Sequence, residues 1–489
     1  MASSELPTVF RPEVGKILVT GASGYIGGSL VPELLVRGYK VRAMVRADLA
    51  GYATLWPGAE VVVADALNIE SLDTALLGVD TAYYLIHSLR LGTRKFAGTD
   101  IAAACNFRRV AERKGVKRII YLGGLGDIHS ALSRHLKNRI EVAEELKRAK
   151  VPLTVLRAAI IVGAGSASYE IIHHLVMKLR VIPIPGWATN RCQPIAIRDV
   201  IKYLVGVLET PATEGASFDI GGNEVLSYKE MISIMADVRG KKVFFLPLPF
   251  SAAKFFAYGA SLFTPVPHAI TECLMEGLKN EVVCQDENIK KLIPFEPISY
   301  RTAVVRAMTR EEQDRVYTRW SDSYRPDHYL AMKLHELKNK CAYTTNYSMI
   351  TEKDASRIFS SICKIGGREG WFHSNWLWRL RGNIDRIFLG VGSARGRKYY
   401  SDLKVNDVID FWRVEDIQEN KRLLLRAEMR LPGKGWLEFM IRDEGELRTL
   451  SVSPYFDTES IIGRGYWMLC LPLHHFIFHN LIKEIEKRS

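Results

Sequence analysis

The sequence has little of what marks a membrane-spanning or secreted protein. Among its 489 residues, no run approaches the ~20 consecutive apolar residues of a transmembrane helix. Residues 1–12 show neither the basic start nor the apolar stretch of a secretory signal. The 7 cysteines are scattered, and none forms a Cys-x-x-Cys pair. This usage predicts reduced thiols in a cytoplasmic protein and disfavours a disulfide framework or a zinc site.

The composition is that of an ordinary globular protein with room for more than one core. Hydrophobic residues make up 47% of the chain and charged residues 25%. The net charge of +13 suits an anionic ligand, a nucleic acid or an anionic membrane surface, and basic residues outnumber acidic ones most clearly between residues 364 and 404. No RNA-binding aromatic motif or zinc-finger spacing accompanies them, so we expect no nucleic-acid partner.

Three glycines near the N-terminus stand at Gly-x-x-Gly-x-x-Gly spacing between an apolar strand-like stretch and a helix-like one. In this context Gly21 allows a tight turn, Gly24 lets the backbone approach a pyrophosphate, and Gly27 lets the helix pack on the strand. The helix N-terminus offers N–H groups and a positive dipole end to the anion. The pattern therefore predicts a dinucleotide site, against the alternative of a purely structural turn.

The residue at the end of the second expected strand bears on which dinucleotide is bound. An NAD-preferring site places an acidic residue there, to hold the ribose 2′-OH. This chain has Arg46, which suits a 2′-phosphate through a charge-assisted hydrogen bond. We therefore expect NADP(H) rather than NAD. The alternative is that Arg46 is only a solvated residue at the end of the strand.

Strand and helix patterns alternate through the first third of the chain, as in a doubly wound α/β fold. Expected strands cover residues 16–20, 40–45, 60–64, 81–85, 118–122 and 153–156. Ligands bind at the carboxyl ends of such strands. Those ends bring Asp65 and Ala66, Ile86 and His87, and Gly123 toward the expected crevice, although an aspartate in such a turn often caps it instead.

These motifs resemble the atypical short-chain dehydrogenases/reductases, which include NmrA-like and epimerase-like proteins. The resemblance rests on residues 20–27, the Asp65 turn and residues 157–160, and covers about residues 14–310. It implies a Rossmann domain with a small substrate lobe. With the glycine motif and the strand ends, it gives the expected cofactor contacts as Gly21, Ser23, Gly24, Tyr25, Ile26, Gly27, Arg46, Asp65, Ala66, Ile86, His87, Gly123, Arg139 and Ala158.

The catalytic pair of that family is missing. Active members use Tyr-x-x-x-Lys on one helix face with a nearby serine; here those positions hold His135 and Arg139, and glycines replace the serine. Three readings stay open. His135 acts as acid and base while Arg139 holds the ribose; or the domain binds NADP(H) without turnover; or this helix is a solvated face and the chemistry lies elsewhere.

A second domain follows a charged, helix-like connector at residues 311–342. Alternating apolar residues at 408–414, 422–429, 435–441 and 447–452 predict an antiparallel meander, and residues 462–487 predict a long C-terminal helix. A curved sheet closed by such a helix is a helix-grip arrangement. We expect Glu428 and Asp410, which lie among apolar strand residues, to pair with Arg413 or Arg430.

Residues 343–486 resemble a domain of unknown function that is fused behind NAD(P)-binding domains in bacterial proteins. The shared motifs include residues 365–371, 376–382, 410–414, 427–433 and 471–478. The resemblance implies a START/polyketide-cyclase-like α+β fold that holds apolar ligands. We expect no metal at His474, His475 and His479, which suit helix packing, whereas Arg395, Arg397 and Lys398 suit either an anionic ligand group or a solvated loop.

The first functional reading is an NADP(H)-dependent oxidoreductase that acts on an apolar carbonyl-type substrate. The alternative is a non-catalytic NADP(H)-binding sensor or scaffold whose second domain binds an apolar ligand or lipid. A third reading is a lipid carrier in peripheral contact with a membrane, drawn from the basic stretch and the apolar run at residues 466–478.

Overall fold

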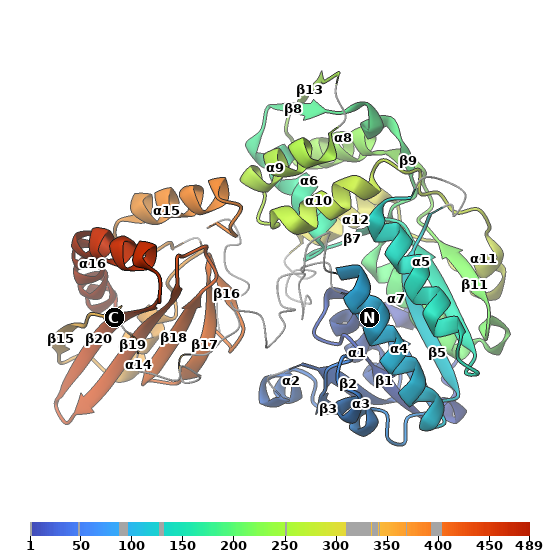
Figure 1. The fold of residues 1–489 in the computed structure, drawn as a ribbon, viewed down its shortest axis with the longest axis horizontal. Helices are drawn as coiled ribbons and strands as arrows, with labels where there is room; N and C mark the ends of the chain where they lie inside the picture. The colour runs from blue at the N-terminus through green and yellow to red at the C-terminus, as the bar shows by residue number, and fades with distance from the viewer. Residues whose placement is uncertain are drawn as a thin grey trace. The chain divides into compact units, whose positions relative to one another are not determined.

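The computed structural model describes residues 2–46, 49–87, 96–126, 132–249, 252–309, 334, 341, 343–367, 369–392 and 403–489. The chain divides into two compact units, Met1–Ser323 and Tyr324–Ser489 (Figure 1). Among the described residues, no helix combines the length and apolarity needed to cross a bilayer.

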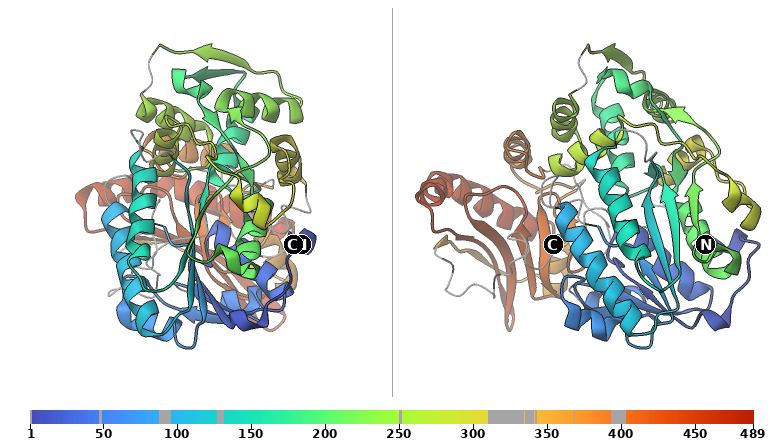
Figure 2. Two further views of the ribbon diagram at one scale, coloured as in Figure 1. Left: turned by 90° about the vertical axis from the view of Figure 1, so that its right-hand side faces the viewer. Right: turned by 45° about the vertical axis from the view of Figure 1, so that its right-hand side comes forward.

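The first unit is built on a seven-stranded parallel sheet in the order β11-β6-β5-β4-β1-β2-β3. Its strands are β1 (Lys16–Val19), β2 (Lys40–Val45), β3 (Glu60–Val63), β4 (Thr81–Tyr84), β5 (Arg118–Gly124), β6 (Leu153–Ala158) and β11 (Ser217–Ile220). Helices flank both faces (Figure 2): α1 (Tyr25–Val36), α2 (Leu49–Leu55), α3 (Ile69–Ala75), α4 (Phe96–Arg113), α5 (Arg134–Lys147), α7 (Ile197–Glu209) and α11 (Asn288–Leu292). This confirms the doubly wound Rossmann fold.

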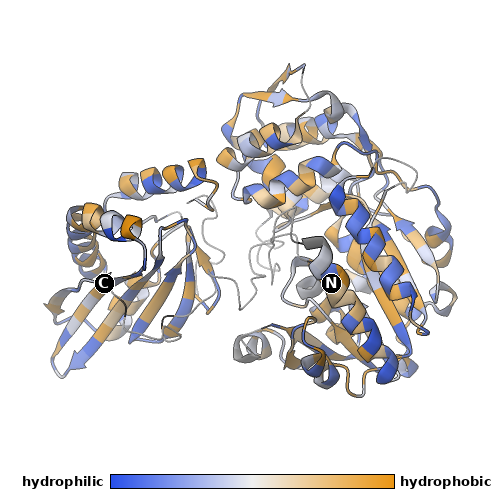
Figure 3. Cartoon of the chain, in the orientation of Figure 1, coloured by the Kyte–Doolittle hydropathy of each residue, from blue (hydrophilic) through white to orange (hydrophobic). Residues whose placement is uncertain are grey.

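Apolar residues on both faces of the sheet explain why helices cover both faces. Along β1, Ile17 and Val19 enter the core beneath α1 and α7, while Leu18 enters the core on the opposite face. Successive side chains of a strand point to opposite faces, so a continuous apolar run demands two layers of helices. In Figure 3 the strands are mainly apolar, whereas α4 and α5 alternate between apolar and polar residues along their length.

A smaller lobe packs over the carboxyl ends of the parallel strands. It contains three two-stranded pairs, β7 (Ile161–Val162) with β10 (Ile195–Ala196), β9 (Arg191–Cys192) with β12 (Leu226–Ser227), and β8 (Val181–Ile184) with β13 (Phe244–Pro247). Its helices are α6 (Ala167–Lys178), α8 (Tyr228–Val238), α9 (Ala253–Phe263), α10 (His268–Gly277) and α12 (Tyr300–Met308). Leu136, in the first turn of α5, lies in the apolar core of this lobe, which ties the lobe to the nucleotide edge of the sheet.

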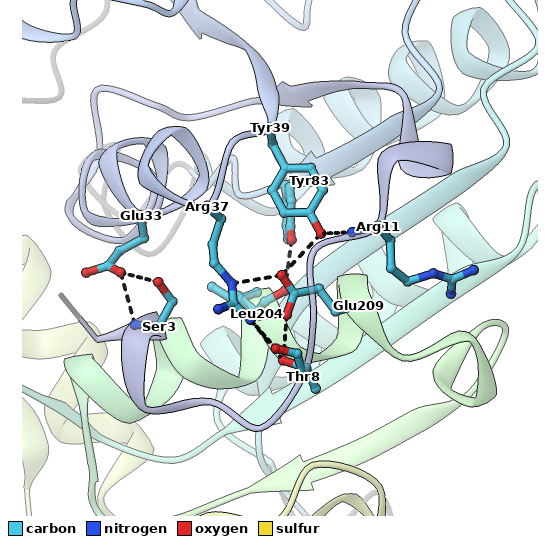
Figure 4. Close-up of polar contacts among 9 residues, drawn as sticks. All are labelled: Ser3, Thr8, Arg11, Glu33, Arg37, Tyr39, Tyr83, Leu204 and Glu209. Carbon is cyan, nitrogen blue, oxygen red and sulfur yellow. Dashed lines mark hydrogen bonds and ion pairs between the residues drawn. The ribbon is translucent and has the colours of Figure 1, made fainter.

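The N-terminal segment is fastened to α1 and α7 by two buried carboxylates (Figure 4). Glu33 accepts hydrogen bonds from the backbone N–H (3.0 Å) and hydroxyl (2.6 Å) of Ser3. Glu209 accepts two from Arg37 (2.9 and 2.6 Å) and one from the Thr8 hydroxyl (2.5 Å). These contacts fix the C-terminal end of α1, and so help to hold its N-terminal end at the sheet edge.

The second unit is an antiparallel sheet with helices. Its strand order is β14-β20-β19-β18-β17-β16, and β15 also pairs with β20. The strands are β14 (Tyr343–Thr344), β15 (Tyr347–Thr351), β16 (Val408–Ile409), β17 (Trp412–Gln418), β18 (Arg422–Ala427), β19 (Lys434–Glu444) and β20 (Leu447–Asp457). Helices α14 (Ala355–Ile362), α15 (Asn375–Ile387) and α16 (Ile461–Lys487) contribute side chains to one core with the sheet.

The second unit confirms the expected antiparallel sheet and long C-terminal helix, with one strand corrected. Residues 408–414 form two strands, because Asp410 adopts a positive φ of 53° and reverses the chain between them. Glu428 pairs with Arg413 at 2.5 Å as expected, whereas Asp410 accepts a hydrogen bond from the Trp371 indole at 3.0 Å. The connector at 311–342, apart from residues 334 and 341, and Arg395, Arg397 and Lys398 lie outside the described residues.

Candidate nucleotide-binding site

The glycine turn after β1 is shaped by close backbone approaches. Gly21 has a positive φ of 62°, and a Cβ there would lie 2.7 Å from the carbonyl oxygen of Leu85. A Cβ on Gly27 would lie 2.4 Å from the carbonyl oxygen of Gly21. At Gly24 the nearest atom lies at 3.1 Å, again that carbonyl. The outer two glycines are therefore required by the fold, while Gly24 leaves space where a phosphate is expected.

The turn is held between neighbouring strands. The backbone N–H of Ala22 donates to Met44 in β2 at 3.3 Å, and the Thr20 hydroxyl donates to Tyr83 in β4 at 2.9 Å. Helix α1 begins at Tyr25, with Gly24 as its N-cap and no side-chain cap. Ser23, Tyr25 and Ile26 thus lie in the turn and the first helical turn, where N–H groups face an anion in such folds.

Arg46 and Asp65, which follow β2 and β3, lie where the adenosine half of the dinucleotide is expected. Arg46 directly follows β2, and the backbone N–H of Ala64 donates to Val45 at 2.9 Å, which joins the two strand ends. Asp65 uses one carboxylate oxygen to accept from the backbone N–H of Leu67 at 2.9 Å. Asp65 therefore caps its own turn, as the alternative interpretation held, and this turn places the buried Ala66 beside it.

The remaining strand ends line the other half of the edge. Ile86 is partly buried and His87 exposed just beyond β4. Gly123 and Gly124 continue β5 and pair with Arg157 and Ala158 of β6. A Cβ on Gly124 would lie 3.0 Å from Leu136 and 3.6 Å from Arg139, so glycine at this position lets α5 approach the sheet closely.

His135 and Arg139 lie one turn apart on α5, beside these glycines. Arg139 is 9% exposed, and the Tyr121 hydroxyl donates to its carbonyl oxygen at 3.2 Å. Burial and the nearby Arg139 charge lower the pKa of His135 to about 3. At neutral pH the imidazole is therefore uncharged, and a cation and a neutral ring stand where the family pattern has lysine and tyrosine.

The structure adds a buried polar cluster behind α5 that the motifs did not indicate. Asn138 donates to Asp100 of α4 at 2.9 Å, and these residues are 2% and 4% exposed. Among the described residues, the second Asp100 oxygen, the Asn138 carbonyl oxygen and the Tyr84 hydroxyl lack hydrogen-bond partners. Asp100 and Asn138 belong to no repeating motif, and only their polarity on otherwise apolar helix faces signals them.

Gly163 is a second site residue that the motifs missed. It follows β7, and a Cβ there would lie 2.6 Å from the Tyr25 hydroxyl and 2.4 Å from Ile197. The lobe backbone therefore approaches the Tyr25 side chain of α1 closely, and a larger residue here would require Tyr25 and Ile197 to shift. Its signal in the sequence is a glycine just after a short apolar pair.

The geometry fits a dinucleotide. The glycine turn leaves room at Gly24, the strand ends converge on one edge, and a buried arginine stands beside the ends of β5 and β6. The expected cofactor residues all fall on this edge, in the turn or on α5. Within the described residues, no group of histidine, cysteine and carboxylate side chains is arranged to hold a metal ion.

Comparison with known proteins agrees with this geometry. Residues 13–317 match the NmrA-like family, and residues 339–481 match a family described as a protein of unknown function, DUF2867. The relatives include NAD(P)-binding reductases and epimerases.

Two curated relatives and one solved structure illustrate the likeness. Subunit 9 of the NADH dehydrogenase [ubiquinone] 1 alpha subcomplex of Arabidopsis thaliana is 27% identical over 50% of this chain and 64% of its own length. Ceramide reductase of Caulobacter vibrioides is 23% identical over 48% of this chain and 74% of its own length. Triphenylmethane reductase of Citrobacter sp., crystallised with NADP(H), is 22% identical over 60% of this chain and 100% of its own length, with a TM-score of 0.51, which shows the shared fold.

Proposed function

The chain belongs to the NmrA-like family, whose relatives here bind NAD(P), and from that premise we propose that it is an NADP(H)-dependent oxidoreductase. Its substrate is the carbonyl group, or a similar group, of an apolar small molecule. The observation that carries this proposal is the glycine turn after β1, together with the buried Arg139 beside Gly124 at the end of β5. Its 7 cysteines are free thiols, which supports a cytoplasmic location.

The preference for NADP(H) rests on Arg46. It directly follows β2, where an NAD-preferring site carries an acid, and a guanidinium there forms a charge-assisted hydrogen bond with a 2′-phosphate. Asp65 takes no part in this preference, because its carboxylate caps its own turn.

When bound, the nicotinamide supplies or accepts the hydride. Arg139 holds the ribose and adds a positive charge at the edge of β5, which favours negative charge developing on a reacting oxygen. His135 is uncharged at neutral pH, so it acts as a hydrogen-bond donor to that oxygen and not as an imidazolium acid, and the proton that completes the alcohol comes from solvent water. The hydrogen bond between Asn138 and Asp100 joins α5 to α4 next to Arg139 in the sequence.

We infer an apolar substrate from the side chains of the lobe and from the name of one relative. The lobe core beside α5 is formed by apolar side chains, and one relative bears the name ceramide reductase. In the second unit, a groove of about 570 Å³ is lined by Thr345, Asn346, Tyr347, Met468, Leu471, Pro472 and His475. We propose that this unit has a helix-grip fold and binds an apolar ligand there.

One observation favours a second candidate, a sensor that binds NADP(H) without turnover. The position of the catalytic tyrosine holds a histidine whose burial lowers its pKa to about 3, which leaves no strong acid at neutral pH. In this case cofactor occupancy would change ligand binding by the second unit.

Two measurements on the full-length chain separate these candidates. The first is NADPH affinity by calorimetry, and the second is NADPH oxidation at neutral pH with a panel of long-chain ketones and quinones. An oxidoreductase binds NADPH and oxidises it with at least one substrate, and Arg139→Ala lowers turnover. Tight NADPH binding without turnover across the panel supports the sensor, and no NADPH binding overturns both.

A further inference from the structure

The small sheet formed by β8 and β13 presents an apolar outer face. The parallel register places Val181 beside Phe244 and Pro183 beside Leu246. On this face Val181 is 51% exposed, Phe244 67% and Leu246 50%. Exposed apolar side chains gathered in one place mark an interaction surface more often than scattered ones do.

Helix α9 of the same lobe also exposes aromatic side chains. Phe255 is 55% exposed, and Tyr258 and Phe263 continue along the helix at three- to five-residue spacing. Ala257 and Ala260 are buried, so α9 has an apolar side toward the lobe and an aromatic side toward solvent. Figure 1 shows β8 and β13 at the end of the lobe opposite the parallel sheet, and therefore away from the nucleotide edge.

Basic side chains dominate the segments that carry these apolar residues, and Lys254 among them lies 4.0 Å from Glu272 of α10. Residues 178–191 and 239–268 contain no aspartate or glutamate. They carry the exposed basic side chains Lys178, Arg180, Arg191, Lys241, Lys242 and Lys254. Apolar side chains ringed by lysine and arginine suit the boundary between the anionic headgroups and the acyl chains of a bilayer.

This charge pattern selects one occupant. A second copy of this face would bring like charges together, which opposes self-association. Helix α16 also exposes apolar side chains, with Ile461 and Leu469 at 84% and 78%, but the segment from 461 to 482 carries only Arg464 as a charged residue. Helix α15 exposes Trp376 at 64%, and its C-cap residue Phe388 is 65% exposed. The lobe surface adds several exposed lysines and arginines to its apolar side chains, a combination that suits anionic lipid.

We infer that the outer face of β8 and β13, with the exposed side of α9, docks on anionic membrane surfaces. The aromatic and aliphatic side chains enter the interface, and the lysines and arginines meet the lipid headgroups. Nothing in this docking requires bound nucleotide, so it stands or fails independently of the oxidoreductase proposal. It would give the lobe access to apolar molecules dissolved in the bilayer.

The test is co-sedimentation of the full-length protein with vesicles of equal parts phosphatidylcholine and phosphatidylglycerol, beside vesicles of phosphatidylcholine alone. We expect binding to the anionic vesicles that weakens in high salt. Lys241→Ala with Lys242→Ala should weaken it about 30-fold, since each lysine near an anionic surface contributes about fivefold. Phe244→Ser with Leu246→Ser should weaken it about tenfold or more.

Control variants change exposed or partly exposed residues elsewhere on the same unit. Leu77→Ser removes a 62% exposed leucine, and Lys290→Ala with Lys291→Ala removes two adjacent charges. Both should leave vesicle binding unchanged, and unaltered circular dichroism spectra should show that all variants fold. The inference is overturned if the wild-type protein does not bind anionic vesicles, or if the lobe variants bind like it. It is also overturned if binding is lost in Leu469→Ser on α16 instead.

Discussion

Substituting Gly27 by alanine tests whether the nucleotide site depends on close packing of α1 against the turn. The added methyl carbon would lie 2.4 Å from the Gly21 carbonyl oxygen and 2.8 Å from the Ala22 Cα. Ordinary contacts of a Cβ begin near 3.4 Å, so turn and helix must separate by about 1 Å. Both obstacles are backbone atoms, which cannot rotate away as a side chain does.

The cost follows from two opposing effects. Overpacking against backbone costs about 3 kcal/mol, at the upper end of the usual range. Alanine is favoured over glycine within a helix by about 1 kcal/mol. The expected net loss is about 2 kcal/mol in the free energy of unfolding of the first unit, and NADPH affinity should fall at least about tenfold because the turn moves away from the phosphates.

Urea unfolding and calorimetric titration with NADPH measure the two effects. Gly259→Ala on α9 is the matched control, because a Cβ there meets nothing within 4 Å. It should stabilise the unit by about 0.5–1 kcal/mol and leave NADPH affinity unchanged. The reasoning is refuted if Gly27→Ala keeps the stability and NADPH affinity of the wild-type protein.

Three further predictions concern charge. Arg46→Asp should weaken NADPH binding about 10- to 150-fold with little effect on NADH, and unchanged affinities for both in calorimetry would contradict the assignment. Burial lowers the pKa of His135 from 6.5 to about 3, so the unfolded chain binds a proton below pH 6.5 that the folded chain does not. This difference in proton binding should lower the free energy of unfolding by about 2 kcal/mol between pH 6.5 and pH 5. In urea titrations at several pH values, His135→Gln should lack this pH-dependent loss of stability. Glu428→Gln removes the carboxylate charge that faces the buried Arg413 and should cost about 3–5 kcal/mol in urea unfolding. Asp416→Asn, at a more exposed ion pair, should cost about 1 kcal/mol or less, and equal losses would argue against a special role for the buried pair.

Much of the fold was predictable because apolar runs and glycines determine it locally. The expected strand at 40–45 coincides with β2, and the five other expected strands agree within two residues, but β11 was not predicted. Strands β5 and β6 extend beyond expectation, since Gly124 pairs with Ala158 and neither residue type signals a strand. The reversal at Asp410 was missed because non-glycine residues seldom adopt a positive φ.

The site was predictable where a motif encodes it and not where the fold assembles it. The glycine turn shows the close approaches expected of Gly21 and Gly27. Ala196 is the N-cap residue of α7, and Asp199 in its first turn accepts from the backbone N–H of Ile298 at 2.9 Å and lies 3.7 Å from Lys202. Asp100 meets Asn138 only through the packing of α4 on α5, which no spacing in the sequence reveals.

The central claim is that this chain moves a hydride between nicotinamide and an apolar substrate. The most direct test supplies NADPH deuterated at the transferred position of the nicotinamide, with the long-chain ketone panel, and weighs the alcohol products by mass spectrometry. The account predicts a product one mass unit heavier than that formed with unlabelled NADPH, and much less of it with Arg139→Ala. Tight binding of NADPH with no deuterated product from any substrate would contradict it.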